Sequence, residues 1–193
     1  MIKTGYKKRG KLIISSTEKS SDLYYASGFS APDNFIYIEH AAEKRIFVSP
    51  LEYGRALKEK KKGTLVCEIR NENTVEIVKK FSSERGVEEF AVPFDFPLGL
   101  AADLTKDGIG LNPVKGSLFP RREVKSVSEL SKIKTALETA ESAMKKAENI
   151  LSESRVDKNG FITWYGEKLS SEILRRMIGL EIVSNGAFSK DTI

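Results

Sequence analysis

Short strand-like and helix-like segments alternate through residues 11–111, and this alternation limits the possible folds more than any other feature of the sequence. Apolar runs of strand length are separated by stretches that carry helix caps, and glycine or proline marks many of the boundaries. The predicted strands are 11–15, 34–39, 45–48, 64–69, 88–92 and 108–111. The predicted helices are 20–26, 50–62, 73–83 and 98–104. Such an alternation predicts an α/β domain with helices layered on a sheet.

Only a short polar turn, at 41–44, separates the predicted strands 34–39 and 45–48. A connection of this length joins antiparallel neighbours, whereas parallel neighbours need a longer crossover. Several of the other predicted strands are joined through helices, which is the usual connection between parallel strands. The sequence therefore predicts a mixed sheet.

A long amphipathic helix follows the looser stretch at 114–122. Ser126 and Glu129 have the Ser-x-x-Glu spacing of a capping box. Apolar residues then recur at three- and four-residue steps, at Leu130, Ile133, Leu137, Ala140, Met144, Ala147 and Leu151. We expect this face to pack on a sheet or another helix, because alanine and methionine at some seam positions disfavour a free coiled coil. A turn at 157–160, a helix at 169–180 and the start of a strand at 192–193 are also predicted.

Size, charge and cysteine content restrict the class of protein. The 193 residues allow one ample domain, or one domain and a piece of another. The net charge of +5 is spread among many acidic residues, so it is mild. A single cysteine excludes an intrachain disulfide and makes a reducing, cytoplasmic location the expectation. No apolar stretch approaches the roughly 20 residues of a membrane helix, so no membrane partner is expected.

Few residues are candidates for chemistry. His40 is the only histidine, which excludes a zinc site of the usual histidine- or cysteine-rich kind within this chain. It is a candidate general base, but a strand-end position beside a turn is the favoured interpretation. Cys67 is a candidate nucleophile, although its apolar neighbours favour a buried strand cysteine. The glycines at 108–110 lack the rest of a dinucleotide-binding fingerprint, and no phosphate-binding loop or Gly-x-Ser-x-Gly motif occurs.

Two further stretches have a functional and a structural interpretation. The basic run at 58–62 could contact nucleic acid, but cations at a helix C-terminus also interact favourably with the helix dipole. The structural interpretation is preferred, because the run contains an acid and no aromatic residue. The aromatic stretch at 22–29 could line a ligand site or an interface, and packing in the core is the preferred alternative.

The segment DLYYASGFSAPDNFIYIEH, followed by RIFVSPLEYGRA, resembles the amino-terminal domain of the creatinase, prolidase and aminopeptidase P family. That domain shows a Tyr-x-x-Gly-Phe turn, then two strands, then an acidic residue that opens a helix. The residues at the matching positions are Tyr25, Gly28, Phe29, Asp33 and Glu52.

Two later stretches resemble the same family in the same order. RREVKSVSELSKIKTALETA is similar to the family's Arg-x-x-Lys-Ser junction, which is followed by a glutamate and an alanine-rich helix. The matching residues are Arg122, Lys125, Ser126, Glu129 and Ala136. GEKLSSEILRRMI and NGAFSKDTI resemble the opening helix and first strand of the "pita-bread" catalytic domain. We therefore expect an amino-terminal-like domain at 1–122, and a linker helix with the first elements of a truncated catalytic domain at 123–193.

The resemblance implies a three-layer, ribonuclease-H-like fold for the first part, followed by a long helix and a partial α+β segment. It also implies that the intact protein is a peptidase with two divalent metals (Mn, Co or Zn), held by two aspartates, one histidine and two glutamates. In the family these ligands follow the first catalytic-domain strand, and His40 lies in the wrong domain to be one of them. No catalytic, cofactor-binding or metal-binding residue is therefore expected in this chain, and whether the chain is an enzyme stays open.

The resulting hypothesis is a truncated, non-catalytic amino-terminal portion of a cytoplasmic Xaa-Pro peptidase-like hydrolase, which shapes substrate access and forms a homodimer. Proline-containing peptides are the partners implied for the intact protein, and nucleic acid is not expected. The alternative is a stand-alone interaction or dimerisation module without peptidase activity. The aromatic region at 24–35 and the apolar face at 130–151 favour that alternative. A reading frame that continues past Ile193 into metal ligands would favour the first hypothesis, and a stop codon the second.

Overall fold

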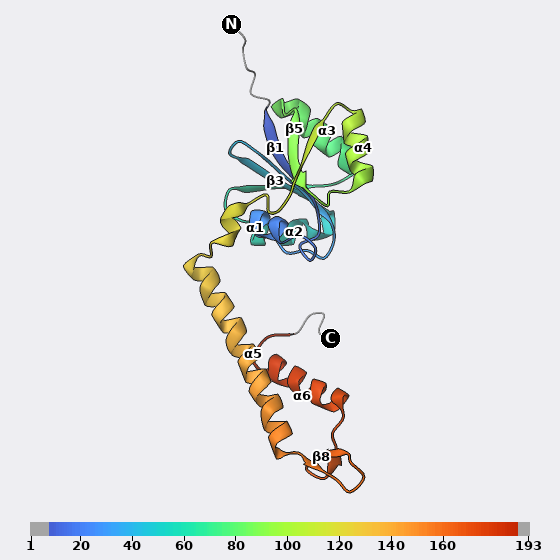
Figure 1. Cartoon of the computed structure of the whole chain (residues 1–193). Helices are drawn as coiled ribbons and strands as arrows, with labels where there is room; N and C mark the ends of the chain where they lie inside the picture. The colour runs from blue at the N-terminus through green and yellow to red at the C-terminus, as the bar shows by residue number, and fades with distance from the viewer. Residues whose placement is uncertain (1–7, 189–193) are drawn as a thin grey trace. The chain divides into compact units, whose positions relative to one another are not determined.

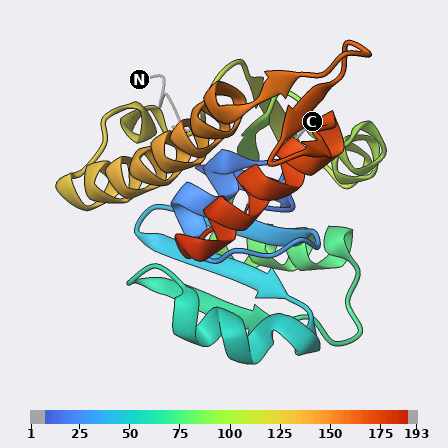
Figure 2. The ribbon, with the colours of Figure 1, turned by 90° about the horizontal axis from the view of Figure 1, so that it is seen from below.

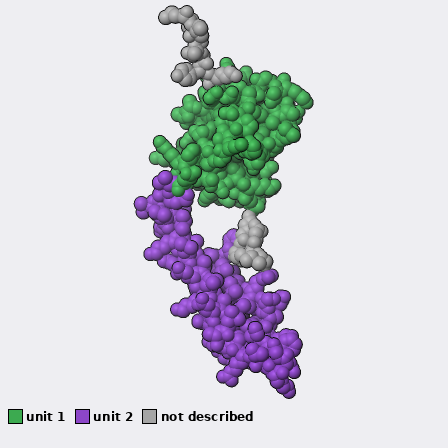
Figure 3. Space-filling model, viewed as in Figure 1, with its two compact units in different colours: residues 1–123 green, residues 124–193 purple. Residues whose placement is uncertain are grey.

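The computed structural model describes residues 8–188. Within it the chain divides into two compact units, with the boundary between Glu123 and Val124 (Figure 3). The strand start predicted at 192–193 lies outside the described residues.

A six-stranded mixed sheet forms the centre of the first unit (Figure 1). Its strands are β1 (Arg9–Ser15), β2 (Phe35–His40), β3 (Glu43–Val48), β4 (Thr64–Glu68), β5 (Glu89–Pro93) and β6 (Gly110–Val114). They are arranged in the order β4-β3-β2-β1-β5-β6. Only β2 is antiparallel to its neighbours, β1 and β3, and the remaining pairs are parallel. The predicted mixed α/β sheet is therefore confirmed.

The β2–β3 hairpin has a tighter connection than the predicted turn at 41–44. His40 pairs with Glu43, so only Ala41 and Ala42 connect the two strands. Ala41 has a φ of 53°, in the left-handed region. Two-residue hairpin turns with positive φ match the twist of the flanking strands, which explains why the strands extend into the predicted turn.

Helices cover both faces of the sheet and give the unit three layers (Figure 1). They are α1 (Ser21–Ser27), α2 (Pro50–Glu59), α3 (Thr74–Arg85) and α4 (Leu98–Lys106), and a short 3-10 helix, η1, spans Pro120–Glu123. Adjacent strand residues enter opposite cores because side chains alternate across a sheet. Leu12 packs with α3 and α4, whereas Ile13 packs with α1 and α2. Each core is a separate cluster of buried side chains.

Two element boundaries differ from the predictions for identifiable reasons. Helix α2 ends at Glu59 rather than at 62, because the backbone N–H of Lys61 donates to the carbonyl of Ser27, at 2.6 Å. Strand β6 includes Pro113, although the predicted strand stopped before it. Proline is tolerated there because β6 is an edge strand, so a missing N–H leaves no partner strand unsatisfied.

The described part of the second unit, residues 124–188, contains two helices and a small three-stranded sheet. Its elements are α5 (Val127–Glu153), β7 (Arg155–Val156), β8 (Ile162–Trp164), β9 (Glu167–Lys168) and α6 (Ser171–Ser184). The predicted capping box is confirmed: the Glu129 N–H donates to Ser126 Oγ at 3.3 Å, and the Ser126 N–H donates to Glu129 Oε2 at 2.8 Å. The predicted turn at 157–160 connects β7 to β8, and there the Asp157 carboxylate accepts from the Asn159 N–H.

Helix α6 lies beside α5 (Figures 1 and 2), but it covers a different face from the one predicted. The buried residues of α5 are Ala143 and Ile150. Most of the predicted apolar face stays exposed; Leu137, for example, is 58% exposed. The covered stripe is turned by one residue, or about 100°, from the predicted one. Periodicity identified the helix correctly, but alanines and serines allow α6 to pack on the neighbouring stripe.

Glu43 provides a pH-dependent contribution to the stability of the first unit. Its carboxylate accepts from Arg85 Nε at 2.7 Å and from Arg45 Nε at 2.6 Å, and so connects α3 to β3. The hydrogen bond from Arg85 is the main reason why the pKa of Glu43 falls from 4.5 to about 2. A lowered pKa stabilises the fold at pH values above the unfolded-state pKa, and that contribution disappears as the pH falls through the folded-state value.

We therefore expect the stability difference between the native chain and a Glu43→Gln variant to be constant from pH 7 to about 5. It should shrink between the two pKa values, 4.5 and about 2. Urea unfolding at pH 6, 4 and 2.5 measures this difference. A difference that stays the same across that range would contradict the assigned role of the ion pairs.

Candidate functional site

The first unit contains a topological switch point between β1 and β5. After β1 the chain forms α1 on one face of the sheet, and after β5 it forms α4 on the opposite face. The two strands are parallel neighbours, so their carboxyl ends lie at the same edge. In open α/β sheets, ligands bind in the crevice outside the carboxyl ends of strands at such a point.

A cleft of about 600 Å³ occupies this position, and we refer to it as the switch-point cleft. It is lined by the ends of β1 and β5, the start of α1, the segment after β6 and Arg122. The lining residues are Ile14, Ser15, Lys19, Ser20, Ser21, Asp22, Asn34, Pro93, Phe94, Asp95, Phe96, Pro97, Gly116, Ser117 and Arg122. Its volume lies within the range of small-molecule sites.

Asp22 holds one wall of the switch-point cleft together. Its carboxylate accepts from Ser117 Oγ at 2.6 Å and from the Leu118 N–H at 2.7 Å. Arg122 Nε lies 2.9 Å from the same carboxylate. Asp22 is therefore an anchor between α1 and the segment that follows β6, across more than ninety residues of sequence.

The switch-point cleft presents charges of both signs beside an apolar rim. Lys19 and Asp95 add a cation and an anion to the Asp22–Arg122 pair. Phe94 is 64% exposed at the rim. No histidine or cysteine is among the described residues that line the cleft. The arrangement suits a polar ligand with both charges and an apolar part, held by ion pairs and hydrogen bonds.

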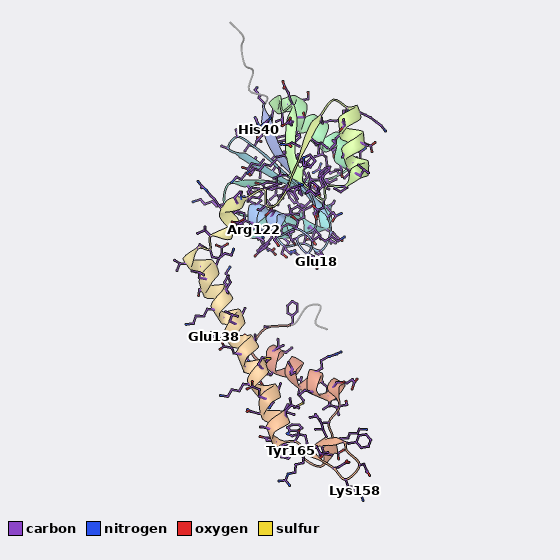
Figure 4. The ribbon with its side chains drawn as sticks, in the orientation of Figure 1. Glu18, His40, Arg122, Glu138, Lys158 and Tyr165 are labelled. Atoms are coloured by element: carbon purple, nitrogen blue, oxygen red, sulfur yellow. The ribbon has the colours of Figure 1, made fainter. Side chains whose placement is uncertain are left out.

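His40 lies at the opposite end of the sheet from this cleft. It ends β2 and pairs with Gly10 near the start of β1, while Arg122 lies near the other edge (Figure 4). The Nδ1 atom of His40 is 3.0 Å from the Arg9 carbonyl oxygen. The structure thus places His40 at a strand end beside a turn, which confirms the interpretation favoured from the sequence.

Cys67 lies in β4, as predicted, but it is half-buried rather than buried. The reason is that β4 is an edge strand, which leaves one side open to solvent. Burial is the main reason why the pKa of the Cys67 thiol is raised; Glu43 also raises it, and Arg45 opposes them. A raised pKa keeps the thiol protonated and therefore a poor nucleophile.

The aromatic stretch contributes both to the core and to the surface. Phe29 and Phe35 are buried and meet edge to face with ring centroids 5.4 Å apart. Tyr24 is exposed and Tyr25 is half-buried. Gly28 caps α1 in the left-handed conformation, with a φ of 69°. Within the stretch 22–29, packing in the core is therefore correct for Phe29 but not for the two tyrosines.

Glu52 lies in the first turn of α2, and the helix begins at Pro50 as predicted. Its carboxylate is 3.4 Å from the Arg55 guanidinium. Arg55 in turn lies over the Phe29 ring, 5.1 Å from its centroid. Of the family-pattern residues, Gly28, Phe29 and Glu52 thus belong to one α1–α2 contact region, whereas Asp33 is an exposed residue in the following loop.

A second pocket, of about 400 Å³, lies on the face of the sheet that carries α1 and α2, and we call it the basic pocket. It is lined by Lys11, Tyr25, Ala26, Tyr37, Glu39, Lys44, Lys61, Leu118, Phe119, Pro120 and Arg121. The sequence does not reveal this pocket, because its residues come from six separate segments. One signal was available: Lys11 and Glu39 each lie two residues from a buried strand residue on the same face, where alternation expects an apolar side chain.

A group of metal ligands does not form among the described residues. Within residues 8–188, no three His, Cys, Asp or Glu side chains come together in a way that could hold an ion. The two-metal centre implied by the family resemblance therefore has no counterpart in this part of the chain. In the same range, no helix is both long and apolar enough to cross a membrane.

The chain belongs to the family defined by the creatinase/prolidase N-terminal domain, whose model matches residues 12–124. This match includes the six strands except the first residues of β1, and every lining residue of the two pockets except Lys11. No curated protein sequence matches the chain at a significant level.

Several solved structures share the fold. The chain is similar to prolidase from Pyrococcus furiosus, with a TM-score of 0.66 and 17% identity over 91% of this chain and 48% of that one. The X-Pro aminopeptidase from Thermotoga maritima gives a TM-score of 0.70 and 15% identity, over 91% and 47%. The Xaa-Pro dipeptidase from Bacillus anthracis gives 0.67 and 17%, over 91% and 44%. The chain thus spans less than half the length of these three proteins, and at such identities the likeness shows the fold.

Proposed function

We propose that this chain acts as the non-catalytic amino-terminal portion of a Xaa-Pro peptidase-like protein. The observation that carries the proposal is the family match over residues 12–124, which places the domain among those of prolidases and X-Pro aminopeptidases. Its role would be to shape the access of proline-containing peptides to a catalytic centre and to join two copies. The switch-point cleft, with both charges and an apolar rim, supports a role in binding short peptides with free ends.

The alternative is a stand-alone dimerisation module. It is favoured by the exposed apolar side chains on α5, which include Leu130, Ile133, Leu137 and Met144. Monomeric soluble proteins rarely leave a large apolar patch uncovered. Both functions include dimerisation, so the two differ in whether peptide recognition is part of the role.

The first test is metal and substrate binding by the chain itself. Calorimetric titration with Co²⁺ and Mn²⁺ should give no tight stoichiometric binding, and the chain should not hydrolyse Ala-Pro in the presence of either ion. Weak binding of Ala-Pro that an Asp95→Asn variant reduces would support peptide recognition. Stoichiometric cobalt binding with Ala-Pro hydrolysis would refute a non-catalytic role.

Dimerisation is tested by sedimentation of the native chain and two variants. We expect the native chain to be a dimer at micromolar concentration, and Leu137→Glu to shift it to monomer because a charge enters the apolar face of α5. Thr135→Glu is the matched control, since it adds the same charge at an exposed position off that face. A native chain that stays monomeric at high concentration would contradict the proposal.

A further inference from the structure

The basic pocket contains an unusual excess of one charge. Four cations line it, Lys11, Lys44, Lys61 and Arg121, against the single carboxylate of Glu39. The net charge of the lining is therefore +3. These cations come from β1, β3, the segment after α2 and η1, so no single helix or run explains why they converge.

The strand register accounts for the position of the row across the sheet. Lys11 pairs with Glu39 between β1 and β2, and Glu39 pairs with Lys44 between β2 and β3. Directly opposed residues point to the same face. The three side chains therefore form a cation–anion–cation row on the face that carries α1 and α2.

The carboxylate of Glu39 is already engaged within the pocket. It accepts a hydrogen bond from the Tyr37 hydroxyl at 2.7 Å, and Lys11 Nζ lies 3.6 Å away. Burial raises the pKa of Tyr37 well above its ordinary value, and the hydrogen bond to Glu39 acts in the same direction. The hydroxyl thus stays protonated and keeps donating. Glu39 is consequently occupied by these two partners and offsets only one of the four cations.

Aromatic rings hold two of the lysines at the pocket. Lys11 Nζ lies 4.2 Å from the centroid of the Phe119 ring, and Lys61 Nζ lies 4.2 Å from that of Tyr25. Lys61 Nζ also donates to the Tyr25 carbonyl at 3.0 Å. Such contacts reduce the freedom of a lysine side chain, so less entropy is lost when an ion binds to it.

Among the described residues, the remaining two cations have no carboxylate within ion-pair distance, although Glu39 lies opposite Lys44 in the strand register. Within residues 8–188, neither Lys44 nor Arg121 forms an ion pair, and Lys44 is half-buried. Like charges around one space repel each other, which costs stability unless an anion neutralises them. The pocket volume of about 400 Å³ suits a compact ligand rather than a macromolecular surface.

We propose that the basic pocket binds a small anion with about three negative charges, such as a diphosphate group or a tricarboxylate. Both ligand types share the chemistry that four converging cations recognise. The proposal goes beyond peptide recognition and does not depend on it, because the basic pocket and the switch-point cleft share no lining residue.

Titration with pyrophosphate and with citrate tests the proposal and tells the two ligand types apart. In a buffer of about 50 mM NaCl, calorimetry should show one site for at least one of the two anions. At a concentration of 100 Kd, that anion should raise the midpoint of thermal unfolding by about 5–10 °C, whereas sodium chloride of equal ionic strength should not. The anion that binds more tightly identifies the ligand type.

Charge reversal locates the site. Lys44→Glu should weaken binding by about tenfold or more, because a cation close to the anion becomes a repulsive charge. Lys61→Glu should act in the same direction and provides a second variant on another element. Lys62→Glu is the matched control: it makes the same change of net charge on the neighbouring exposed residue, which does not line the pocket, and should change the affinity by less than about threefold.

Two outcomes would overturn the proposal. One is that neither anion binds at concentrations up to about 10 mM, where a Kd of 1 mM still gives high occupancy. The other is that Lys44→Glu and Lys62→Glu weaken binding equally, which would show a general charge effect. Far-UV circular dichroism of each variant confirms that a loss of binding is not a loss of fold.

Discussion

Replacing Gly28 with alanine is expected to destabilise the first unit by about 2–4 kcal/mol. Two physical reasons combine at this position. Gly28 has a φ of +69°, which side-chain-bearing residues rarely adopt, and an added Cβ would lie 2.9 Å from the backbone nitrogen of Lys61. That nitrogen belongs to the hydrogen bond that ends α2, so it cannot move away without breaking the bond. Urea unfolding followed by circular dichroism measures the loss.

Gly63→Ala is the matched control for this prediction. Gly63 also has a positive φ, of +87°, but an added Cβ would have no atom within 4 Å. We expect this control to lose only the cost of the backbone conformation, about 1–2 kcal/mol. Equal losses at the two glycines would show that the close approach of Gly28 to Lys61 adds nothing.

Asp22→Ala is expected to destabilise the first unit by about 2–3 kcal/mol. Its carboxylate accepts two hydrogen bonds and pairs with Arg122, and only 12% of the side chain is exposed. Removing it leaves the Leu118 N–H and a partly buried guanidinium with poorer partners, which costs more than an exposed ion pair contributes. The same unfolding measurement applies, and Asp22→Asn should lose less because an amide oxygen still accepts one bond.

Asp33→Ala serves as the control for Asp22. Asp33 is exposed and lies in the same segment, 22–40, that resembles the family. Surface substitutions of this kind change stability by less than about 0.5 kcal/mol. If Asp22→Ala were as mild as Asp33→Ala, the anchor between α1 and the segment after β6 would contribute nothing to the fold. The wall of the switch-point cleft would then need another explanation.

The local elements could be predicted from the sequence, because caps and periodicity act over a few residues. The capping box at Ser126, the hairpin of β2 and β3, and the start of α2 at Pro50 are examples. The two- and three-residue strands of the second unit could not, because such short segments have no alternation to detect. The prediction of which face of α5 is covered was wrong for a related reason. The small residues of this helix permit packing on either of two neighbouring stripes.

The candidate sites could largely not be predicted from the sequence. The switch-point cleft depends on the order β1-β5-β6, which is decided by pairing between distant segments. Asp22 carries no motif that points to Ser117 or Arg122. The basic pocket likewise depends on the register of β1, β2 and β3. The family resemblance could identify the domain, because the pattern around Gly28 and Phe29 reflects a local packing requirement.

The two edges of the six-stranded sheet differ in how they can grow. On one side, β6 carries Pro113, which has no backbone N–H to offer an incoming strand. On the other side, β4 has no proline, and Leu65 points outward with 53% of its surface exposed. If the sheet extends across two molecules, whether as orderly assembly or as aggregation, we expect it to do so at the β4 edge. Pro113 thus makes the two edges of the sheet unequal as sites for an incoming strand.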